Sequence, residues 1–428
     1  MRKVFSDVVI IGFALFAMFF GAGNLIFPPS LGLVSGDSWL ISFLGFLLTG
    51  IGMPLLGIVA VSKAGGSLGD LADKVSPTFS KVLGTVIMLA LGPLLAIPRT
   101  AATTFEMGVR PIFPSVSPVI SSIIYFAITF ALVIKPSSVI DTIGKFLTPT
   151  LLVILAIIIF KGVTDPIGVL ANTGLENSFS RGFTEGYQTM DALGSIVIGG
   201  IIIKTLVSKG YTKKDEQVKL AIMSAVVAAL GLTFVYGGLM YLGATGSTIF
   251  DPSIPKTDLT MQITSAILGN IGKVAIGIAV SLACLTTSIG LTATCGEFFN
   301  NLTNGKLSYK SIVTTIIIFS TIMSNFGVEK IVGLAIPLLV TVYPVVIILI
   351  LMNLFDKYIP NKGVYSGAVI GAVCISIFEA LSAAGVEVYS ILDVIGRLPL
   401  SSQGFSWIVP ALVGAMITGV IGRKKHNF

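Results

Sequence analysis

Charged residues, histidine and cysteine are all scarce in this chain of 428 residues. Charged side chains make up only 11% of it, the single histidine lies in the basic tail, and the three cysteines have no CxxC spacing. Because a soluble domain has about 25% charged residues, a water-soluble protein is excluded. The histidine and cysteine counts leave no ligand set for zinc, haem or an iron–sulfur cluster, and structural disulfides are not expected.

Common catalytic motifs are missing as well. No GxxxxGK[ST] segment is present, so the chain does not hydrolyse ATP through a P-loop. A membrane-embedded enzyme needs a nucleophile with a base, and no histidine falls in an apolar run. We therefore predict that the chain is not an enzyme and has no enzymatic cofactor.

Apolar residues dominate instead, at 54% of the chain. Runs of about 20 apolar residues are long enough to cross about 30 Å of hydrocarbon. They predict an all-α polytopic membrane protein, with lipid as its surroundings and about twelve transmembrane helices. The predicted spans lie near residues 7–29, 39–61, 80–106, 118–135, 146–161, 184–206, 217–242, 272–298, 311–325, 331–354, 364–385 and 404–422.

Lysine and arginine predict the orientation of these spans. Most of the 27 positive residues fall between spans on the side that holds both chain ends, and positive residues collect in cytoplasmic loops. Both termini are therefore expected in the cytoplasm. The same rule explains the net charge of +7, so no nucleic-acid partner is predicted.

The first span interrupts itself halfway. In "FALFAMFFGAGNLIFPPSLG", residues 13–32, a helical run meets Gly21, Gly23 and Asn24 before two prolines. Non-helical backbone at membrane depth persists only where it lines a cavity or is buried in protein. Two half-helices would then offer N–H groups to an anion and C=O groups to a cation. The alternative is that the glycines only permit close helix packing.

The sixth span contains a second candidate interruption. "RGFTEGYQTMDALGSIVIGG" places Asp191 and then Gly194-Ser195 at mid-span, and an ionised Asp at this depth costs about 2.5–3.5 kcal/mol. Its partner is a substrate ammonium, a cation, an arginine or a proton. Asp191 as a cap of the second half-helix is the alternative.

The order of spans and interruptions predicts an internal symmetry. Spans one to five and six to ten form a five-plus-five inverted repeat, in which the broken first and sixth helices occupy equivalent places. No residue-level repeat supports this, so the symmetry rests on the order alone. We predict one integral-membrane domain, 1–428, with repeats at 1–161 and 184–354 and two additional helices at 364–422.

Two segments resemble a known family. "FAMFFGAGNLIFPPSLG" closely resembles the first-helix signature of the bacterial branched-chain amino acid:cation symporters, and "GYQTMDALGSIVIG" resembles their sixth-helix segment. The resemblance implies the inverted-repeat fold of neurotransmitter:sodium and amino acid–polyamine transporters, in the bacterial cytoplasmic membrane. It also implies uptake of leucine, isoleucine and valine driven by Na+ or by protons, with no obligate protein partner.

The resemblance further implies a Na+ site on the eighth span, "KVAIGIAVSLACLTTSIGLTATCGEFF". Thr287 and Ser288 match the family's hydroxyl pair, Cys284 supplies a helical carbonyl, and the first helix supplies the carbonyls of Ala17 and Phe20. Neutral hard oxygens suit a monovalent hard cation. The alternative is that both hydroxyls bond their own i−4 carbonyls.

The substrate site is expected where the two interruptions meet. The backbone of Gly21, Ala22, Gly23 and Asn24 would hold the α-carboxylate. Carbonyls from Thr189 to Gly194, helped by Asp191, would hold the ammonium. The nearest apolar side chains are the candidate pocket walls, although each is equally an ordinary packing residue: Phe19, Phe20, Met190 and Leu193.

Other readings stay open. A proton-coupled symporter of the same fold would use Asp191 or Glu106 as its proton site. A channel would use the interruptions as a filter, but no filter-like repeat is present. Arg99 and Glu106 are seven residues apart and so share a helix face; they form either a gate pair or two solvated interfacial charges. Residues 243–269, with two prolines, are a candidate outer lid.

Overall fold

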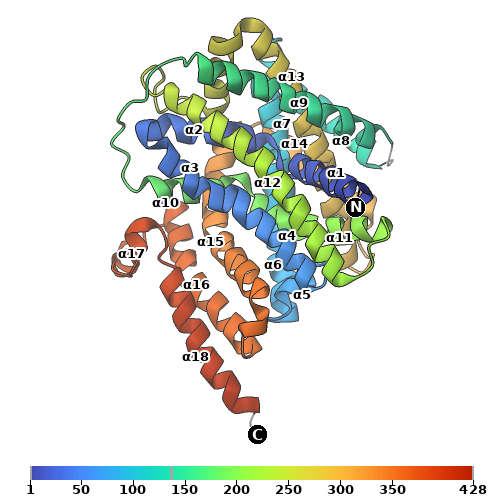
Figure 1. The fold of residues 1–428 in the computed structure, drawn as a ribbon, viewed down its shortest axis with the longest axis vertical. Helices are drawn as coiled ribbons and strands as arrows, with labels where there is room; N and C mark the ends of the chain where they lie inside the picture. Colours follow the sequence, from blue (N-terminus) through green and yellow to red (C-terminus); the bar gives the residue numbers. More distant parts are fainter. Residues whose placement is uncertain (1, 135–137, 427–428) are drawn as a thin grey trace.

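The computed structural model describes residues 2–134 and 138–426, and within these ranges the chain forms helices and turns without any β-strand (Figure 1). The first half holds nine α-helices: α1 (Arg2–Phe19), α2 (Ala22–Ser35), α3 (Trp39–Leu47), α4 (Met53–Ala64), α5 (Leu68–Ala72), α6 (Pro77–Leu89), α7 (Ala96–Thr103), α8 (Pro118–Ile134) and α9 (Ser138–Thr164). Short π-helical turns at 48–52, 90–94 and 104–109 lie within the second and third spans.

The second half is built in the same way. Its helices are α10 (Ser178–Glu185), α11 (Asp191–Ser208), α12 (Lys214–Thr245), α13 (Lys256–Leu302), α14 (Tyr309–Ser324), α15 (Val328–Leu354), α16 (Lys362–Ala383), α17 (Tyr389–Gly396) and α18 (Ile408–His426). Local signals set several helix starts: the Ser76 and Ser308 hydroxyls each accept the N–H three residues on, which caps α6 and α14.

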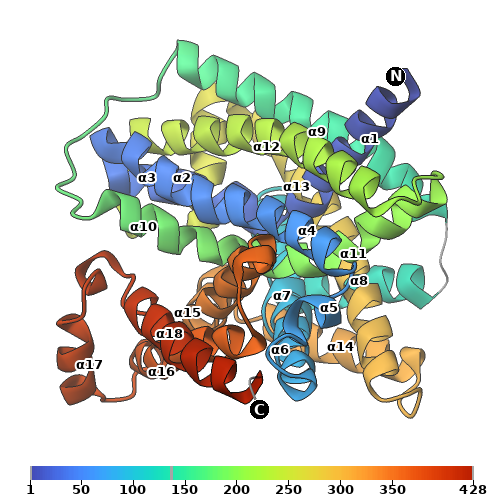
Figure 2. The ribbon, with the colours of Figure 1, turned by 60° about the horizontal axis from the view of Figure 1, so that its bottom comes forward.

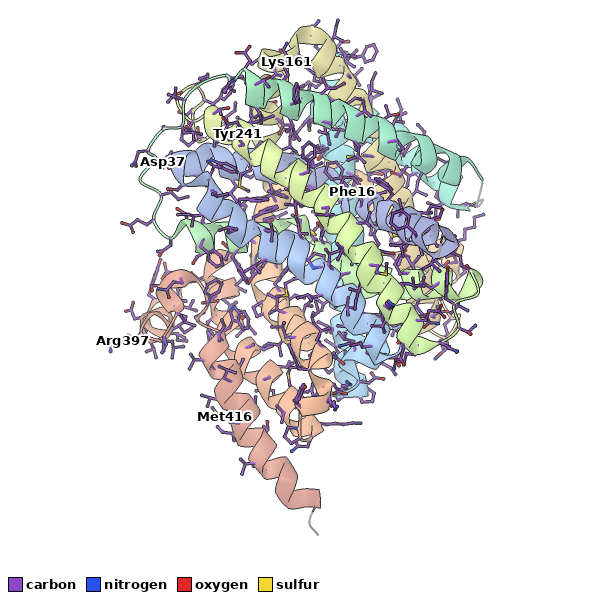
Figure 3. All side chains as sticks on the ribbon, in the orientation of Figure 1. Phe16, Asp37, Lys161, Tyr241, Arg397 and Met416 are labelled. Carbon is purple, nitrogen blue, oxygen red and sulfur yellow. The ribbon has the colours of Figure 1, made fainter. Side chains whose placement is uncertain are left out.

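Seven helical stretches are long and apolar enough to cross a membrane, and five shorter apolar helices accompany them. Their outward faces are apolar too: Phe160 is 73% exposed, and Met416 on α18 is 63% exposed (Figure 3). Water would not tolerate so many bare apolar side chains, whereas lipid does. The all-α membrane class is confirmed, and the total of twelve spans stays a prediction.

Three elements differ from the sequence-based expectation. The third span kinks at Gly92 (φ −91°, ψ −124°), one residue before Pro93, and no kink was predicted there. Most of the candidate lid, expected as a loop, is helical: α13 starts at Lys256 and turns sharply at Gly269 (φ 64°). The additional helix α17 precedes the last span.

Both halves of the first span, α1 and α2, pack against α12. In Figure 2, α12 lies between α9 and α2. The contact needs two glycines, because a Cβ on Gly32 would lie 1.9 Å from the Met240 carbonyl and one on Gly243 would lie 2.0 Å from the Pro29 carbonyl. Such close backbone approach fixes α2 against α12. The helices α16 and α18 pack on each other at one end of the molecule, next to α15 (Figure 1).

Polar contacts join elements at both ends of the helical bundle. At the end holding the N-terminus, Asp7 accepts from the Lys209 ammonium (2.7 Å) and the Tyr211 hydroxyl (2.8 Å), and Lys74 pairs with Asp356 at 2.8 Å. Burial acts to raise the pKa of Asp356, but hydrogen bonds from Lys74 and its neighbour Tyr365 outweigh it, so the pKa lies below its ordinary value.

At the opposite end, the start of α13 is tied to two other spans. Lys256 pairs with Glu329 of α15 at 3.1 Å, and Asp258 pairs with Arg110, which follows the third span. These ion pairs join the candidate lid segment to its neighbours.

Candidate functional site

The first span is interrupted at Phe20 and Gly21, here called the first break. α1 ends at Phe19, α2 begins at Ala22, and Gly21 is extended (φ −117°, ψ −169°). The Gly21 N–H donates to the Asn24 Oδ1 at 3.3 Å instead of continuing the helical ladder. The Ala17 carbonyl, four residues earlier, therefore loses its helical donor.

The sixth span is interrupted at residues 186–190, here called the second break. α10 ends at Glu185, a 3₁₀ turn covers Gly186–Thr189, and Met190 adopts a left-handed conformation (φ 63°, ψ 10°) before α11 starts at Asp191. The expected interruption at Gly194-Ser195 is wrong, because both residues lie inside α11. The break lies about one turn earlier and ends at Met190.

The carbonyls of the second break are mostly occupied. The Met190 carbonyl accepts from the Gly194 N–H (3.0 Å), and the Gly186 carbonyl accepts from the Thr189 hydroxyl (2.9 Å). Within the described part of the chain, no hydrogen bond reaches the Thr189 carbonyl. The ammonium was expected to bind carbonyls from Thr189 to Gly194. At the break itself, the Thr189 carbonyl is the one that is available to a ligand.

The two breaks lie side by side and are joined by one side chain. The Asn24 Nδ2 donates to the Asp191 Oδ2 at 2.6 Å and also to the Tyr236 hydroxyl of α12. Asn24 and Asp191 are only 2% and 7% exposed. The Asp191 carboxylate is thus oriented by the first break, and among the described residues it makes no hydrogen bond that caps α11.

Arg99 enters the same space from the third span, seven residues after the Gly92 kink. Its Nη1 donates to the Gln188 carbonyl at 2.7 Å, and its guanidinium lies over the Phe27 ring, 5.3 Å from the centroid. The side chain is 4% exposed, and its Nε has no partner among the described atoms. Asp191 lines the same cavity, although no ion pair within 4.0 Å joins the two side chains among the described residues. Two buried groups of opposite charge therefore line one cavity beside the two breaks.

The expected gate pair between Arg99 and Glu106 is wrong. Glu106 instead accepts from the Thr257 hydroxyl (2.6 Å) and from the Val328 N–H (3.0 Å). These partners begin α13 and α15, so Glu106 ties the third span to both. Arg99 and Glu106 therefore contact different elements: Arg99 binds the second break, and Glu106 binds the starts of α13 and α15.

A cavity of about 70 Å³ lies between the breaks and the third span. Its walls include residues predicted for the substrate site or for the Na+ site: Phe19, Gly21, Ala22, Gly23, Asn24, Thr189, Met190, Asp191, Gly194 and Thr287. The sequence did not point to the other wall residues, which are Met18, Leu91, Ala96, Arg99, Thr100, Ile198 and Leu291. The structure therefore brings the predicted substrate residues together and adds the third span to them.

Five predicted residues do not line this cavity: Ala17, Phe20, Leu193, Cys284 and Ser288. Phe20 stacks between Phe16 and Tyr236, with centroid distances of 5.2 and 6.2 Å. Leu193 is fully buried in the helix core. As a result, neither apolar side chain is available as a pocket wall in this conformation.

The two hydroxyls predicted for the Na+ site on the eighth span differ from each other: Thr287 makes the i−4 bond that the alternative expected, and Ser288 does not. Thr286 and Thr287 both donate to the Ala283 carbonyl at 2.9 Å. The Thr287 hydroxyl also lies near the first break, since a Cβ on Gly21 would be 3.8 Å from it. Ser288 is fully buried and has no partner among the described atoms. Thr287 thus lies beside the first break, and the Ala283 carbonyl and the Thr286 hydroxyl lie within one turn of it on α13.

Known proteins match this chain over nearly its full length. The family model described as branched-chain amino acid transport protein matches residues 4–425. The branched-chain amino acid permease BraB of Bacillus subtilis is 41% identical over 97% of this chain and 95% of its own. A branched-chain amino acid transport system 2 carrier protein of Pseudomonas aeruginosa is 35% identical over 97% and 96%.

This chain belongs to the branched-chain amino acid transport protein family. Its members are membrane transporters, so the prediction that the chain is not an enzyme is confirmed. The resemblance that the first and sixth spans indicated is also confirmed.

Solved structures support the fold of this family member. Mhp1, a nucleobase–cation symport family transporter in a closed conformation with bromovinylhydantoin bound, aligns with a TM-score of 0.62 over 97% of this chain and 92% of its own. A Na+-coupled sialic acid symporter aligns with a TM-score of 0.51 over 98% and 96%. Both are 12% identical, so they show the fold alone. The predicted five-plus-five inverted-repeat class is confirmed.

The sequence assigned Arg99 to a gate or to the membrane interface, whereas the structure places it in the wall of the central cavity. An arginine in the middle of an apolar run costs as much to insert as an aspartate does. A second buried charge of opposite sign was therefore a signal that Asp191 has a partner. Its position next to Gln188 and Gly23 depends on the kink at Gly92, which the apolar pattern does not reveal.

Proposed function

We propose that this transporter imports leucine, isoleucine and valine together with Na+ by alternating access. Its membership of a branched-chain amino acid transport family supports the substrate class. The observation that carries the proposal is the buried pair of Arg99 and Asp191, held in one cavity between two broken helices.

The pair matches the charges of a zwitterion. Arg99 would receive the α-carboxylate through Nε and Nη2, together with N–H groups at the start of α2, where the helix dipole favours an anion. Asp191 and the Thr189 carbonyl would receive the ammonium. An uncharged molecule of the same shape would leave both buried charges without new partners, which is costly. The site therefore selects amino acids over simple amines and acids.

Apolar walls fit an aliphatic side chain. Leu91 and Ala96 of the third span face Ile198 of α11 and Leu291 of α13 across the cavity. None of them offers a polar atom beyond its backbone. A hydrophobic wall of this kind discriminates weakly among branched aliphatic side chains, at about 1–3 kcal/mol per methylene, so we expect all three substrates to be carried.

The Na+ site is proposed between the first break and α13. The free Ala17 carbonyl lies on α1, and the Ala283 carbonyl and the hydroxyls of Thr286 and Thr287 lie on α13. Neutral oxygens of this kind suit a monovalent cation. The carbonyls of Phe20 and Cys284 and the buried, unpartnered hydroxyl of Ser288 are the candidate ligands of the alternative register.

One ion per substrate is sufficient for uptake. A potential of about 100 mV supplies about 2.3 kcal/mol per Na+ ion, which supports roughly 50-fold accumulation at about 1.4 kcal/mol per decade. Coupling requires ion and substrate to stabilise the same closed state, and the first break contributes to both proposed sites. We place both termini in the cytoplasm of a bacterium because positive residues collect on that side. With this orientation the ties at Glu106 and Lys256 would face outward, and those at Asp7 and Lys74 would face inward.

Proton coupling is the second candidate, and the buried Asp191 carboxylate favours it. In that mechanism a proton on Asp191 would replace Na+ as the coupling ion. Glu106 is a poorer proton site because its two oxygens already accept hydrogen bonds from Thr257 and Val328.

Uptake of radiolabelled leucine into proteoliposomes distinguishes these candidates. A Na+ gradient and a pH gradient are imposed separately, with the membrane potential clamped and protein-free liposomes as the control. We expect accumulation with the Na+ gradient alone. Accumulation with the pH gradient alone, unchanged by Na+, would replace Na+ with a proton, and equilibration without accumulation would indicate a channel.

A further inference from the structure

A second cavity, of about 220 Å³, lies apart from the central one. It is bounded by the end of α10 and the 3₁₀ turn after it, by the middle of α15, by the last turns of α16 and by the segment that leads into α18. The residues that matter for its chemistry are Tyr187, Val340, Pro344, Glu379 and Trp407. None of them lines the cavity between the two breaks.

Glu379 gives this cavity a negative charge without a matching cation. Its carboxylate accepts a hydrogen bond from the Ser406 hydroxyl, and it is only partly exposed. Among the side chains that the structure describes, no lysine or arginine lies within ion-pair distance of it. A carboxylate in a membrane helix faces a cavity or a partner and marks a functional site by default.

Aromatic rings stand beside the carboxylate. Trp407 and Tyr187 are 7% and 5% exposed, and Tyr187 stacks on Tyr343 with the centroids 4.3 Å apart, so its ring is held in place. The faces of tryptophan and tyrosine attract ammonium ions, and ammonium ligands are recognised by aromatic walls of this kind. Val340 and Pro344 supply apolar surface for a short alkyl group.

We propose that this cavity binds a small aliphatic ammonium ion, with Glu379 as its counter-ion and Tyr187 and Trp407 as its walls. The free amine end of an aliphatic amino acid and the ethanolamine headgroup of a lipid both carry this group. Tyr187 belongs to the second break, so an occupant would press on the segment that carries the Thr189 carbonyl. That consequence for transport rests on the proposed function; binding itself does not.

Trp407 makes the test direct, because the chain has only two tryptophans and the other, Trp39, lies in α3 against Tyr241. In a full-length Trp39→Phe protein, Trp407 is the only indole fluorophore. The protein is placed in phosphatidylglycerol nanodiscs and titrated with isopentylamine, with isopentanol as the uncharged control ligand. We expect a saturable change in Trp407 fluorescence with the amine and none with the alcohol.

Variants then assign the charge. Glu379→Gln keeps the shape and an oxygen for Ser406, and we expect its Kd for isopentylamine to rise at least tenfold. Glu387→Gln removes a charge from the nearby exposed loop and should leave the Kd unchanged. Val340→Phe fills the cavity and should also abolish binding, which keeps the test decisive if Glu379→Gln folds poorly.

The outcomes separate the possible occupants and the two proposals. Competition by phosphatidylethanolamine in the nanodisc would assign the site to a lipid headgroup, and its absence would assign it to a free amine. An unchanged Kd in Glu379→Gln, or equal binding of isopentanol, would overturn the ammonium site. Arg99→Gln should leave this titration intact while strongly raising the leucine concentration for half-maximal uptake, so failure of either proposal is visible without the other.

Discussion

The two breaks differ in how the chain leaves the helix. The first is two residues long, and its extended Gly21 is bridged by the Asn24 side chain. The second runs over residues 186–190, ends in a left-handed Met190, and is held by a guanidinium from another span. One break is closed locally and the other depends on tertiary contact.

The two breaks therefore present different groups to the ligands. The first leaves the Ala17 carbonyl without its helical donor and brings the start of α2 to the cavity, so it can serve ion and substrate at once. The second presents one charge, Asp191, and one free carbonyl, Thr189, both toward the substrate. We infer that the first break couples the two ligands and the second recognises the zwitterion.

Removing the guanidinium is expected to have the largest effect, because it acts on both breaks. Arg99→Gln should raise the leucine concentration for half-maximal uptake by about 100-fold or more, since the buried substrate carboxylate would lose its positive partner, and an uncompensated buried charge costs about 3–5 kcal/mol. Arg99→Lys, which keeps the charge but not the fork of donors, should be intermediate.

Uptake kinetics in proteoliposomes measure this, with Arg397→Gln as the control, because Arg397 is exposed at the end of α17. Isopentylamine and isocaproate should both inhibit the native protein poorly, since each satisfies one charge of the pair. Normal leucine affinity in Arg99→Gln would mean that the second break needs no guanidinium and that the backbone alone holds the carboxylate.

The second largest effect is expected at the proposed ion site. The first break contributes a carbonyl to this site, and the second break contributes none. The double variant Thr286→Val, Thr287→Val keeps side-chain shape while removing two oxygens. We expect the Na+ concentration for half-maximal uptake to rise at least about tenfold, as for the loss of one or two ligand interactions of about 1.4 kcal/mol. Thr294→Val is the matched control, because Thr294 makes the same i−4 bond on α13.

A version of this experiment on Ser288 separates the two registers of the site. Ser288→Ala should leave Na+ dependence unchanged if Thr286 and Thr287 are the ligands. A strong Na+ defect in Ser288→Ala alone would restore the register that the sequence resemblance implied.

The sequence located both breaks but not their cause. Glycines marked the first break, yet Gly21 has an ordinary extended conformation that any residue adopts, and the residue that organises the break is Asn24. At the second break the marked glycine, Gly194, is helical, and the left-handed residue that interrupts the helix is Met190. Local propensity identifies where backbone is irregular, whereas the left-handed Met190 is sustained by contacts that only the folded chain supplies.

The contribution of the third span was beyond the reach of pattern reading. Its apolar run continues through Gly92 and Pro93, and a proline within a membrane helix signals a kink only weakly, because neighbouring helices accommodate it. The register of the Na+ site on the eighth span is likewise not decided by pattern: Thr286, Thr287 and Ser288 are adjacent hydroxyls, and only packing decides which of them face the first break.

Two glycines of the first break give a paired test of smaller size. A Cβ on Gly23 would lie 2.8 Å from Nη2 of Arg99 and 2.9 Å from the Phe27 ring, whereas one on Gly21 would meet nothing closer than 3.8 Å. We expect Gly23→Ala to weaken leucine affinity by about tenfold, because overpacking costs about 1–3 kcal/mol. Gly21→Ala should stay within about twofold.

Uptake kinetics of both variants, with thermal stability as the control for folding, decide the point. Equal loss in both would mean that the first break requires glycine flexibility, and equal tolerance would mean that the guanidinium moves aside freely.

The smallest effect is expected on stability, at the left-handed residue of the second break. Met190 has φ 63°, a conformation that costs about 1 kcal/mol or more for residues other than glycine and is worst for β-branched side chains. Met190→Val should therefore destabilise the protein by about 1–2 kcal/mol relative to Met190→Leu, which keeps similar volume and an unbranched Cβ. Thermal unfolding in detergent compares the two variants. At Gly21, where φ is negative, Gly21→Val and Gly21→Leu should cause equal backbone strain. If Met190→Val is as stable as Met190→Leu, the backbone there is relaxed, and the contrast between a locally closed break and one maintained by tertiary contacts does not hold.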